Sequence, residues 1–231
     1  MKRNHLFLLS LLLFCASVTF AFVRQGTTFS MKDPKGVSSI LFTLDSPYEP
    51  LSGIATGIDG SVAFDPADVG ATRGEVVVRT DSLRMTVDRM TDHLHSERWL
   101  DAERYPEIRF RFDALRNVKQ NAARVEAIQA GAAGAWSAEA EGELTLHGVT
   151  KRITVPVSLT WFPGKLQSRV ANMQGDLMVV RSDFSIRRSD FGIDGGLPET
   201  ILADRIDLRV RIVGVAPKDG VGTYAPAEAR N

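Results

Sequence analysis

The chain has 231 residues, and its 28 lysine and arginine residues are balanced by 28 aspartate and glutamate residues. Residues 1–21, which we predict below to be a cleaved leader, contain Lys2 and Arg3. Without these two residues, 26 basic and 28 acidic residues remain, a net charge of −2 with no long basic run. This balance argues against nucleic-acid binding, which depends on neutralising phosphates. A mature chain of about 210 residues can bury a sizeable core as one domain.

Residues 1–21 predict a secretory signal peptide. Lys2 and Arg3 precede an apolar run from Leu6 to Phe14, and small residues follow as far as Ala21. A positive start, a short apolar core and a small-residue cleavage region are typical of such a leader. The core is too short for a membrane span, which needs about 20 apolar residues. We therefore expect cleavage near Ala21 and a periplasmic or secreted mature protein.

The single cysteine, Cys15, lies within this leader. It could instead serve for lipid attachment, but the preceding Phe14 is large where such sites have a small residue. If Cys15 leaves with the leader, the mature chain has no thiol. Disulfide bonds, thiol catalysis and cysteine-based metal sites would then be absent together.

Much of the mature chain alternates apolar and polar residues, as strands with one buried face do. In chain order these segments are 40–44, 76–78, 108–112, 153–161 and 206–212. Residues typical of turns lie between them, and we predict reversals at Asp59-Gly60, Asp65-Pro66, Gly74, Pro163-Gly164 and Gly195-Gly196. Many strands without a strand–helix–strand rhythm argue for an antiparallel sandwich or barrel.

Residues 88–98 form the one segment with helical periodicity. Its charges are interspersed with apolar residues at roughly helical spacing, continuing just past it: Met90, Leu94 and Leu100. The helix must end before Pro106, because proline disfavours helical geometry in the residue before it. We therefore predict a short amphipathic helix that leads into a strand.

Two further segments are less regular. Residues 122–140 are rich in alanine, which favours helix, but Gly131 and Gly134 interrupt the run. We interpret this segment as two strands joined by a turn at Gly131–Gly134. Residues 216–231 are polar and contain two prolines, which predicts a disordered tail.

Three landmarks occur in order along the mature chain. The first combines Arg89, Asp92, His93 and Leu94 with Trp99-Leu100-Asp101 and Tyr105-Pro106-Glu107-Ile108-Arg109-Phe110. The second is Gly142-Glu143-Leu144-Thr145-Leu146-His147-Gly148-Val149-Thr150-Lys151, and the third is Arg188-Ser189-Asp190-Phe191-Gly192-Ile193. The ordered set resembles the YceI-like, polyisoprenoid-binding family of bacterial periplasmic proteins, over about residues 27 to 215. His95 departs from the family's usual arginine, and Trp99-Leu100 from its aromatic pair.

The resemblance implies an all-β domain over residues 22–215. Its fold would be an eight-stranded antiparallel, lipocalin-like barrel with the short helix near one end. The interior would hold an isoprenoid lipid, either a polyisoprenoid or an isoprenoid quinone, for transport or storage, with no other cofactor and no enzymatic activity. We predict that the lumen is lined by Phe42, Phe110, Phe112, Leu144, Leu146, Phe184, Ile186, Leu208 and Val210.

The polar residues of the landmarks are expected at the barrel rim in structural roles: Arg89, Asp92, His93, His147, Arg188 and Asp190. Asp92 and His93 would pin the helix across one end of the barrel by hydrogen bonds. Arg188 and Asp190 could tie adjacent strands. Alternatively, Arg188 could meet a polar head group at the barrel mouth.

Several alternatives compete with lipid binding. An eight-stranded barrel can also be filled by its own side chains, as in a stress-response or interaction module. His93, His95 and His147 suggest a metal site, but the side chains of His93 and His95, two apart on a helix, diverge, so we expect none. A hydrolase with Asp92, His93 and Ser96 or Ser189 lacks any nucleophile motif.

Two questions concern membranes and assembly. An outer-membrane barrel would alternate in the same way, with its apolar face toward lipid, but the polar tail and the charged helix argue against it. Transient contact of the mature protein with a membrane is compatible with the sequence. Homodimerisation is equally compatible with it.

Overall fold

The computed structural model describes residues 26–48, 50–193, 196, 198 and 200–218. The predicted signal peptide and the part of the predicted tail beyond residue 218 lie outside these residues. The strands are β1 Thr27–Ser30, β2 Ser39–Leu44, β3 Leu51–Ala55, β4 Ile58–Phe64, β5 Arg73–Arg79, β6 Leu83–Met85, β7 Glu107–Asn121, β8 Gly134–Leu146, β9 Val149–Phe162, β10 Gly175–Arg187 and β11 Arg205–Pro217. The helices are α1 Asp88–His95, α2 Val125–Gln129 and α3 Leu166–Arg169, with short 3-10 turns η1 Val69–Ala71, η2 Thr80–Ser82 and η3 Ser189–Phe191.

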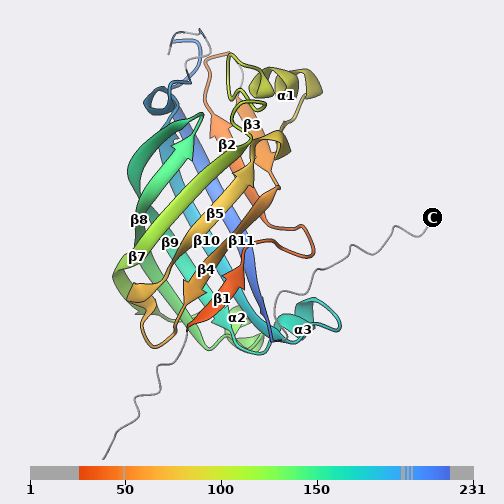
Figure 1. Cartoon of the computed structure of the whole chain (residues 1–231), viewed down its shortest axis with the longest axis vertical. Coiled ribbons are helices and arrows are strands. Elements are labelled where there is room, and N and C mark those ends of the chain that lie inside the picture. The colour runs from red at the N-terminus through yellow and green to blue at the C-terminus, as the bar shows by residue number, and fades with distance from the viewer. Residues whose placement is uncertain (1–25, 49, 194–195, 197, 199, 219–231) are drawn as a thin grey trace, which may run out of the picture.

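The strands form one antiparallel sheet that closes on itself (Figure 1). Its order is β1-β4-β5-β7-β8-β9-β10-β11-β2-β3-β6, and β1 also pairs with β11, where Ser30 lies opposite Val215. The first six strands are short, and they share three positions of the barrel as β1 with β2, β3 with β4 and β5 with β6. The predicted eight-stranded antiparallel barrel is confirmed.

Alternation along the strands decides which side chains face inward. In β11, Ile206, Leu208 and the apolar residues that continue the alternation line the interior, whereas Asp207 and Arg209 are exposed. Side chains of a strand point to opposite faces in turn, so a periodicity of two places the whole apolar set inside. The strands predicted at 40–44, 76–78, 108–112, 153–161 and 206–212 are all present. The last of them extends to Pro217, so Ala216 and Pro217, which we predicted to belong to the disordered tail, end strand β11 instead.

Two predicted reversals were wrong. Asp59-Gly60 lies within β4 and Gly74 lies within β5. These two glycines allow β4 and β5 to approach closely. A Cβ atom at Gly60 would be 2.2 Å from the Glu75 carbonyl oxygen, and one at Gly74 would be 2.3 Å from the Ser61 carbonyl oxygen. Asp65-Pro66 and Pro163-Gly164 do follow strands as predicted. Gly195 of the last predicted reversal lies outside the described residues.

The alanine-rich segment 122–140 also differs from its prediction. It contains the short helix α2, and β8 begins only at Gly134. Helix propensity is realised between Val125 and Gln129, and Gly131, with a φ of 89°, follows the helix as a left-handed residue. Two strands do meet around this segment, but a helix lies between them in place of a simple turn.

Side chains fill the barrel at the end that carries α2 and α3. Figure 1 shows these two helices at the end opposite α1. Phe64 is at the centre of an aromatic cluster there, with its ring centroid 5.6 Å from that of Trp136, 6.1 Å from that of Trp161 and 6.2 Å from that of Phe29. Phe29 and Phe64 are almost completely buried. These four aromatic residues, named the floor cluster below, close this end of the interior.

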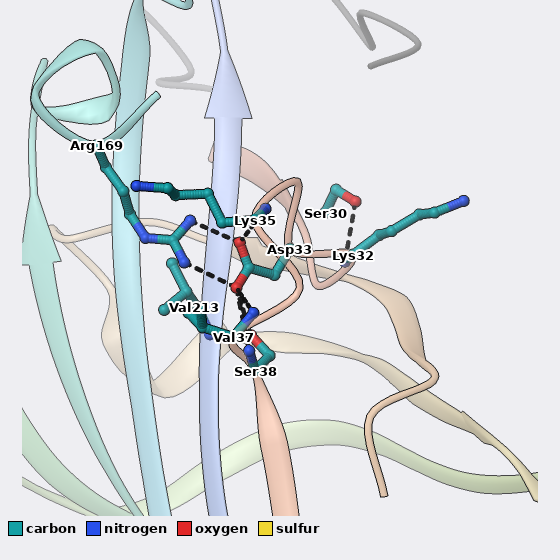
Figure 2. A network of polar contacts seen from close by, with 8 residues as sticks. All are labelled: Ser30, Lys32, Asp33, Lys35, Val37, Ser38, Arg169 and Val213. Atoms are coloured by element: carbon teal, nitrogen blue, oxygen red, sulfur yellow. Dashed lines mark hydrogen bonds and ion pairs between the residues drawn. The ribbon is translucent and has the colours of Figure 1, made fainter. Parts of the chain in front are cut away.

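A second, smaller core lies on the outer face of β10 and β11. Helix α3 covers it, and its buried residues are Leu166, Val170, Leu177 and Val215. The loop between β1 and β2 is tied to α3 by an ion pair between Asp33 and Arg169 (Figure 2). In the described part of the chain, no helix is both long and apolar enough to span a membrane.

Candidate functional site

Beyond the floor cluster, the barrel interior holds a cavity of about 450 Å³. Pockets that hold small ligands have volumes of about 300–1,000 Å³, so this cavity is of a size to hold one. All nine predicted lumen residues lie on its wall: Phe42, Phe110, Phe112, Leu144, Leu146, Phe184, Ile186, Leu208 and Val210. Their contact with a ligand stays a prediction.

The cavity opens toward the end of the barrel that carries α1. Met178 and Ile212 line its deep part and are 0 % and 2 % exposed. Ile206 and Leu208, nearer the start of β11, line the same cavity but keep partial exposure. Solvent therefore reaches the α1 half and not the deep half, which the floor cluster closes. This open end is named the mouth below.

The wall is almost entirely apolar. Among the residues that the structure describes, its polar members are Ser46, Thr72, His93, Ser182 and Arg188. Thr72 Oγ1 donates to the Val69 carbonyl oxygen at 2.7 Å, and Ser182 Oγ donates to the Pro156 carbonyl oxygen at 2.6 Å. These two hydroxyl groups thus donate to backbone oxygens, and the deep wall offers a bound ligand mainly apolar contacts.

Arg188 is a buried charge beside the mouth, with 3 % exposure. Its Nε donates to Ala203 O at 3.2 Å, Nη1 to Ile193 O at 3.1 Å and Nη2 to Leu202 O at 3.1 Å. These bonds hold η3 against the chain that enters β11, so Arg188 shapes the loop at the mouth. Asp190, which we expected beside it, is exposed on η3.

The same loop is held by Asp204. Burial would raise the pKa of this carboxyl group, but hydrogen bonds from Ser189 N and Ser189 Oγ, both 2.8 Å long, and the nearby charges of Arg188 and Arg187 outweigh it. The pKa of Asp204 is therefore lowered, and the group is charged at neutral pH. Arg188 and Asp204 together fix both ends of the loop.

Helix α1 lies beside the mouth with its apolar face on the cavity, where Met90 and Leu94 line the wall. It is attached to β6 by Thr91 Oγ1, which accepts from Met85 N at 2.9 Å, and by His95 Nε2, which lies 2.9 Å from Leu83 O. Thr91 and His95 are four positions apart and so share one helix face.

We predicted that Asp92 and His93 would make these attachments, and that assignment was wrong. The side chains of Asp92 and His93 are exposed, as is that of Arg89. The hydrogen bonds to β6 come from Thr91 and His95 instead. Spacing of four residues was the signal that could have identified the correct pair. His93 lies on the cavity wall at the mouth instead.

The three sequence landmarks meet at one point of the rim. His147 and Gly148 form the two-residue turn between β8 and β9, with φ values of 51° and 73°, as a type I′ hairpin turn requires. The Tyr105 ring contacts His147 edge-on at 5.0 Å, and His147 Nδ1 lies 3.1 Å from Phe191 O. The landmarks are therefore parts of one rim structure.

A substitution at Gly148 tests the packing of the Tyr105 ring against the turn between β8 and β9. A Cβ atom there would lie 2.5 Å from the Tyr105 ring, and the positive φ already disfavours any side chain. We expect Gly148→Ala to lower the free energy of unfolding by about 2–4 kcal/mol. Gly164→Ala is the matched control, since Gly164 has a φ of 65° with nothing within 4 Å of its Cβ position; it should cost about 1 kcal/mol. Denaturant titration measures both, and equal losses would contradict the packing role.

Histidines and serines considered for metal binding or hydrolysis have other contacts. Among the described residues, no three His, Cys, Asp or Glu side chains gather as a metal site would require. Ser96 Oγ donates to the backbone oxygen of His93 at 2.6 Å, and Ser189 Oγ bonds to Asp204. Both hydroxyls considered as nucleophiles are thus engaged elsewhere.

The outer surface of the barrel is charged. Asp183 of β10, for example, points outward and pairs with Arg209 at 3.4 Å and Arg211 at 3.1 Å. Apolar side chains face the cavity and charged ones face outward. An outer-membrane barrel has the reverse arrangement, with an apolar exterior and a polar lumen.

Comparison with known proteins decides the family. The model of the YceI-like domain matches residues 33–214. The chain belongs to the YceI-like family. Among its relatives, a UPF0312 protein of Pseudomonas savastanoi pv. phaseolicola is 27 % identical over 171 residues, covering 74 % of this chain and 77 % of that protein. Another UPF0312 protein, from Pseudomonas fluorescens, is 28 % identical over the same length.

Solved structures show the same YceI-like fold. BcnA of Burkholderia cenocepacia matches with a TM-score of 0.57 and 20 % identity, covering 78 % of this chain and 98 % of that one. A polyisoprenoid-binding domain of Saccharophagus degradans, implicated in plant cell wall breakdown, matches with a TM-score of 0.58 and 13 % identity, covering 84 % and 100 %. At these identities the likeness concerns the fold.

Proposed function

We propose that this YceI-like protein is a periplasmic or secreted binding protein that holds an isoprenoid lipid in its barrel for transport or storage. The observation that carries the proposal is the cavity of about 450 Å³ with an apolar wall that opens beside α1. The leader at residues 1–21 supports export. The name of the Saccharophagus degradans domain supports an isoprenoid as ligand.

The free energy gained by burying apolar surface favours a ligand with a long apolar chain. Each methylene withdrawn from water contributes about 0.8 kcal/mol, so two or three five-carbon isoprene units supply roughly 8–12 kcal/mol. Association costs about 4–15 kcal/mol in lost freedom, so burial of a guest of this length offsets most of that range without a buried polar anchor. A wall whose deep hydroxyls already bond to the backbone suits such a guest.

The polar end of the lipid would stay at the mouth. Ser46 and His93 lie on the wall there, whereas the floor cluster occupies the opposite end. A quinone or alcohol head group can remain hydrated in this position while its tail enters the barrel. This orientation avoids the cost of burying an unpaired polar group.

Native mass spectrometry tests the proposal directly. The mature protein is purified from a periplasmic extract of its source, and separately as delipidated protein incubated with polyprenol or an isoprenoid quinone. We expect a bound isoprenoid in the first sample and its uptake in the second, and an N-terminus near Phe22. Protein that carries no lipid and takes up none from either addition would remove the carrier function.

One alternative has support of its own. The floor cluster fills one end of the interior with side chains, and a barrel filled throughout would suit a stress-response or interaction module. Such a module predicts that delipidated protein ignores added isoprenoids. The same mass-spectrometric measurement therefore separates the two functions.

A further inference from the structure

Large apolar side chains are exposed around the mouth. Tyr48, in the loop between β2 and β3, is 82 % exposed; Val87, just before α1, is 50 % exposed; and Ile201, in the loop before β11, is 39 % exposed. All three loops lie at the same end of the barrel. Leu44, the last residue of β2, is paired with the start of β3 and with the start of β11. Strand β6, which ends just before Val87, pairs with β3 at the same end. These three residues are named the apolar rim below.

The apolar rim is continuous with the cavity. Ile201 is exposed to solvent and also lines the cavity wall. Beside it, Met90 and Leu94 of α1 carry the apolar wall toward the mouth. On this side of the mouth, an apolar molecule could therefore pass from outside into the barrel along apolar side chains.

The opposite end of the barrel lacks this continuity. Val125 and Ile128 of α2 are 66 % and 57 % exposed there, but neither lines the cavity. The floor cluster separates that end from the cavity. Exposed apolar side chains thus occur at both ends of the protein, but among those of the described residues only Ile201, at the mouth, also lines the cavity.

Charge around the mouth helps to choose the occupant of the apolar rim. Exposed charges at the mouth are mixed in sign: Asp88 and Asp92 flank Arg89 on α1. Arg187 and Arg205 lie opposite each other at the ends of β10 and β11, with Asp190 exposed on η3 and Asp207 paired with Arg205. Docking on anionic lipid requires a cluster of basic residues, and here acidic residues accompany the basic ones. Tyrosine, in contrast, is enriched where a bilayer meets water, and Tyr48 is the most exposed member of the rim.

We infer that the apolar rim docks on the surface of a zwitterionic phospholipid bilayer, so that the lipid guest passes directly between membrane and barrel. This inference rests on the proposed function, because it assigns the route by which the guest reaches the cavity. Docking would be reversible and apolar, and insensitive to salt. Weak, reversible binding suits a carrier that must leave the membrane again.

The test compares two double variants. Tyr48→Ser with Val87→Ser removes exposed apolar surface at the mouth without touching the cavity wall, and serine at position 87 also suits the start of α1. Val125→Ser with Ile128→Ser removes similar surface at the other end. Each protein is mixed with phosphatidylcholine vesicles that contain radiolabelled polyprenol, and sedimentation and polyprenol uptake are measured.

We expect the mouth variant to lose about tenfold in vesicle association and in uptake rate, and the α2 variant to match the wild type. Binding of farnesol from solution should be equal in all three proteins. A mouth variant that matches the wild type, or association that requires anionic lipid, overturns the docking. Farnesol and polyprenol binding test the carrier function and sedimentation tests the rim, so each can fail alone.

Discussion

A tryptophan in place of Val210 is expected to remove most isoprenoid binding while the barrel stays folded. Val210 lies on the cavity wall with its backbone paired to Ile40 on one side and Ser182 on the other. The indole would occupy space in the cavity. Displacing four methylene-sized groups of the guest forfeits about 3 kcal/mol, which is about a hundredfold in the dissociation constant. Titration with polyprenol measures this loss.

The fold should tolerate Val210→Trp, because filling a cavity commonly stabilises a protein by about 0.5–2 kcal/mol. The unfolding temperature should therefore hold or rise. Leu41→Trp is the matched control, since Leu41 is 40 % exposed and lies outside the cavity wall, next to Phe42 on the wall. It should bind polyprenol as the wild type does. Undiminished binding by Val210→Trp would place the ligand somewhere other than this cavity.

The inner face of the barrel could be predicted from the sequence because alternation fixes the direction of every side chain in a strand. Phe110 and Leu208, for example, were identified as inward facing from their neighbours alone, and both line the cavity. Depth along the barrel axis could not be predicted. Nothing in the local pattern of Phe64 or Trp136 shows that they fill one end, because their contact joins strands far apart in the chain.

At the rim, too, the sequence predicted some features and not others. The residues of the three landmarks were recognised in order, but their meeting through Tyr105, His147 and Phe191 depends on the closure of the barrel. On α1 the mistake was local. Asp92 and His93 were selected because they belong to a landmark, whereas the spacing of Thr91 and His95 on one helix face determines which side chains reach β6.

A large loss of stability is expected from Asp33→Asn. The Asp33 side chain is 2 % exposed, and it accepts from Arg169 Nη1 at 2.6 Å and from Nη2 at 2.7 Å (Figure 2). It also accepts from backbone N–H groups of its own loop, including that of Val37 at 2.9 Å. Asparagine would keep the shape but present an amide N–H₂ group to donors and leave Arg169 without its counter-charge.

Breaking a buried pair costs about 3–5 kcal/mol, and we expect about 3 kcal/mol because the Arg169 side chain keeps 17 % exposure. Asp183→Asn is the matched control: it removes pairs to Arg209 and Arg211 on the exposed surface and should cost under about 1 kcal/mol. Denaturant titration of both variants at neutral pH measures the difference. Similar losses would show that the Asp33 pair contributes no more than a surface pair.

Acidification should remove the same contribution from the wild type. Burial raises the pKa of Asp33, but the hydrogen bonds from Arg169 and from the loop backbone outweigh it, so the pKa is lowered in the folded state. A carboxyl group with a depressed folded pKa stabilises fully above its unfolded pKa of about 3.9. That stabilisation is lost as pH falls through the folded pKa. The stability gap between wild type and Asp33→Asn should therefore be constant near neutral pH and shrink below about pH 4, and a gap that does not depend on pH would assign the loss to packing and not to charge.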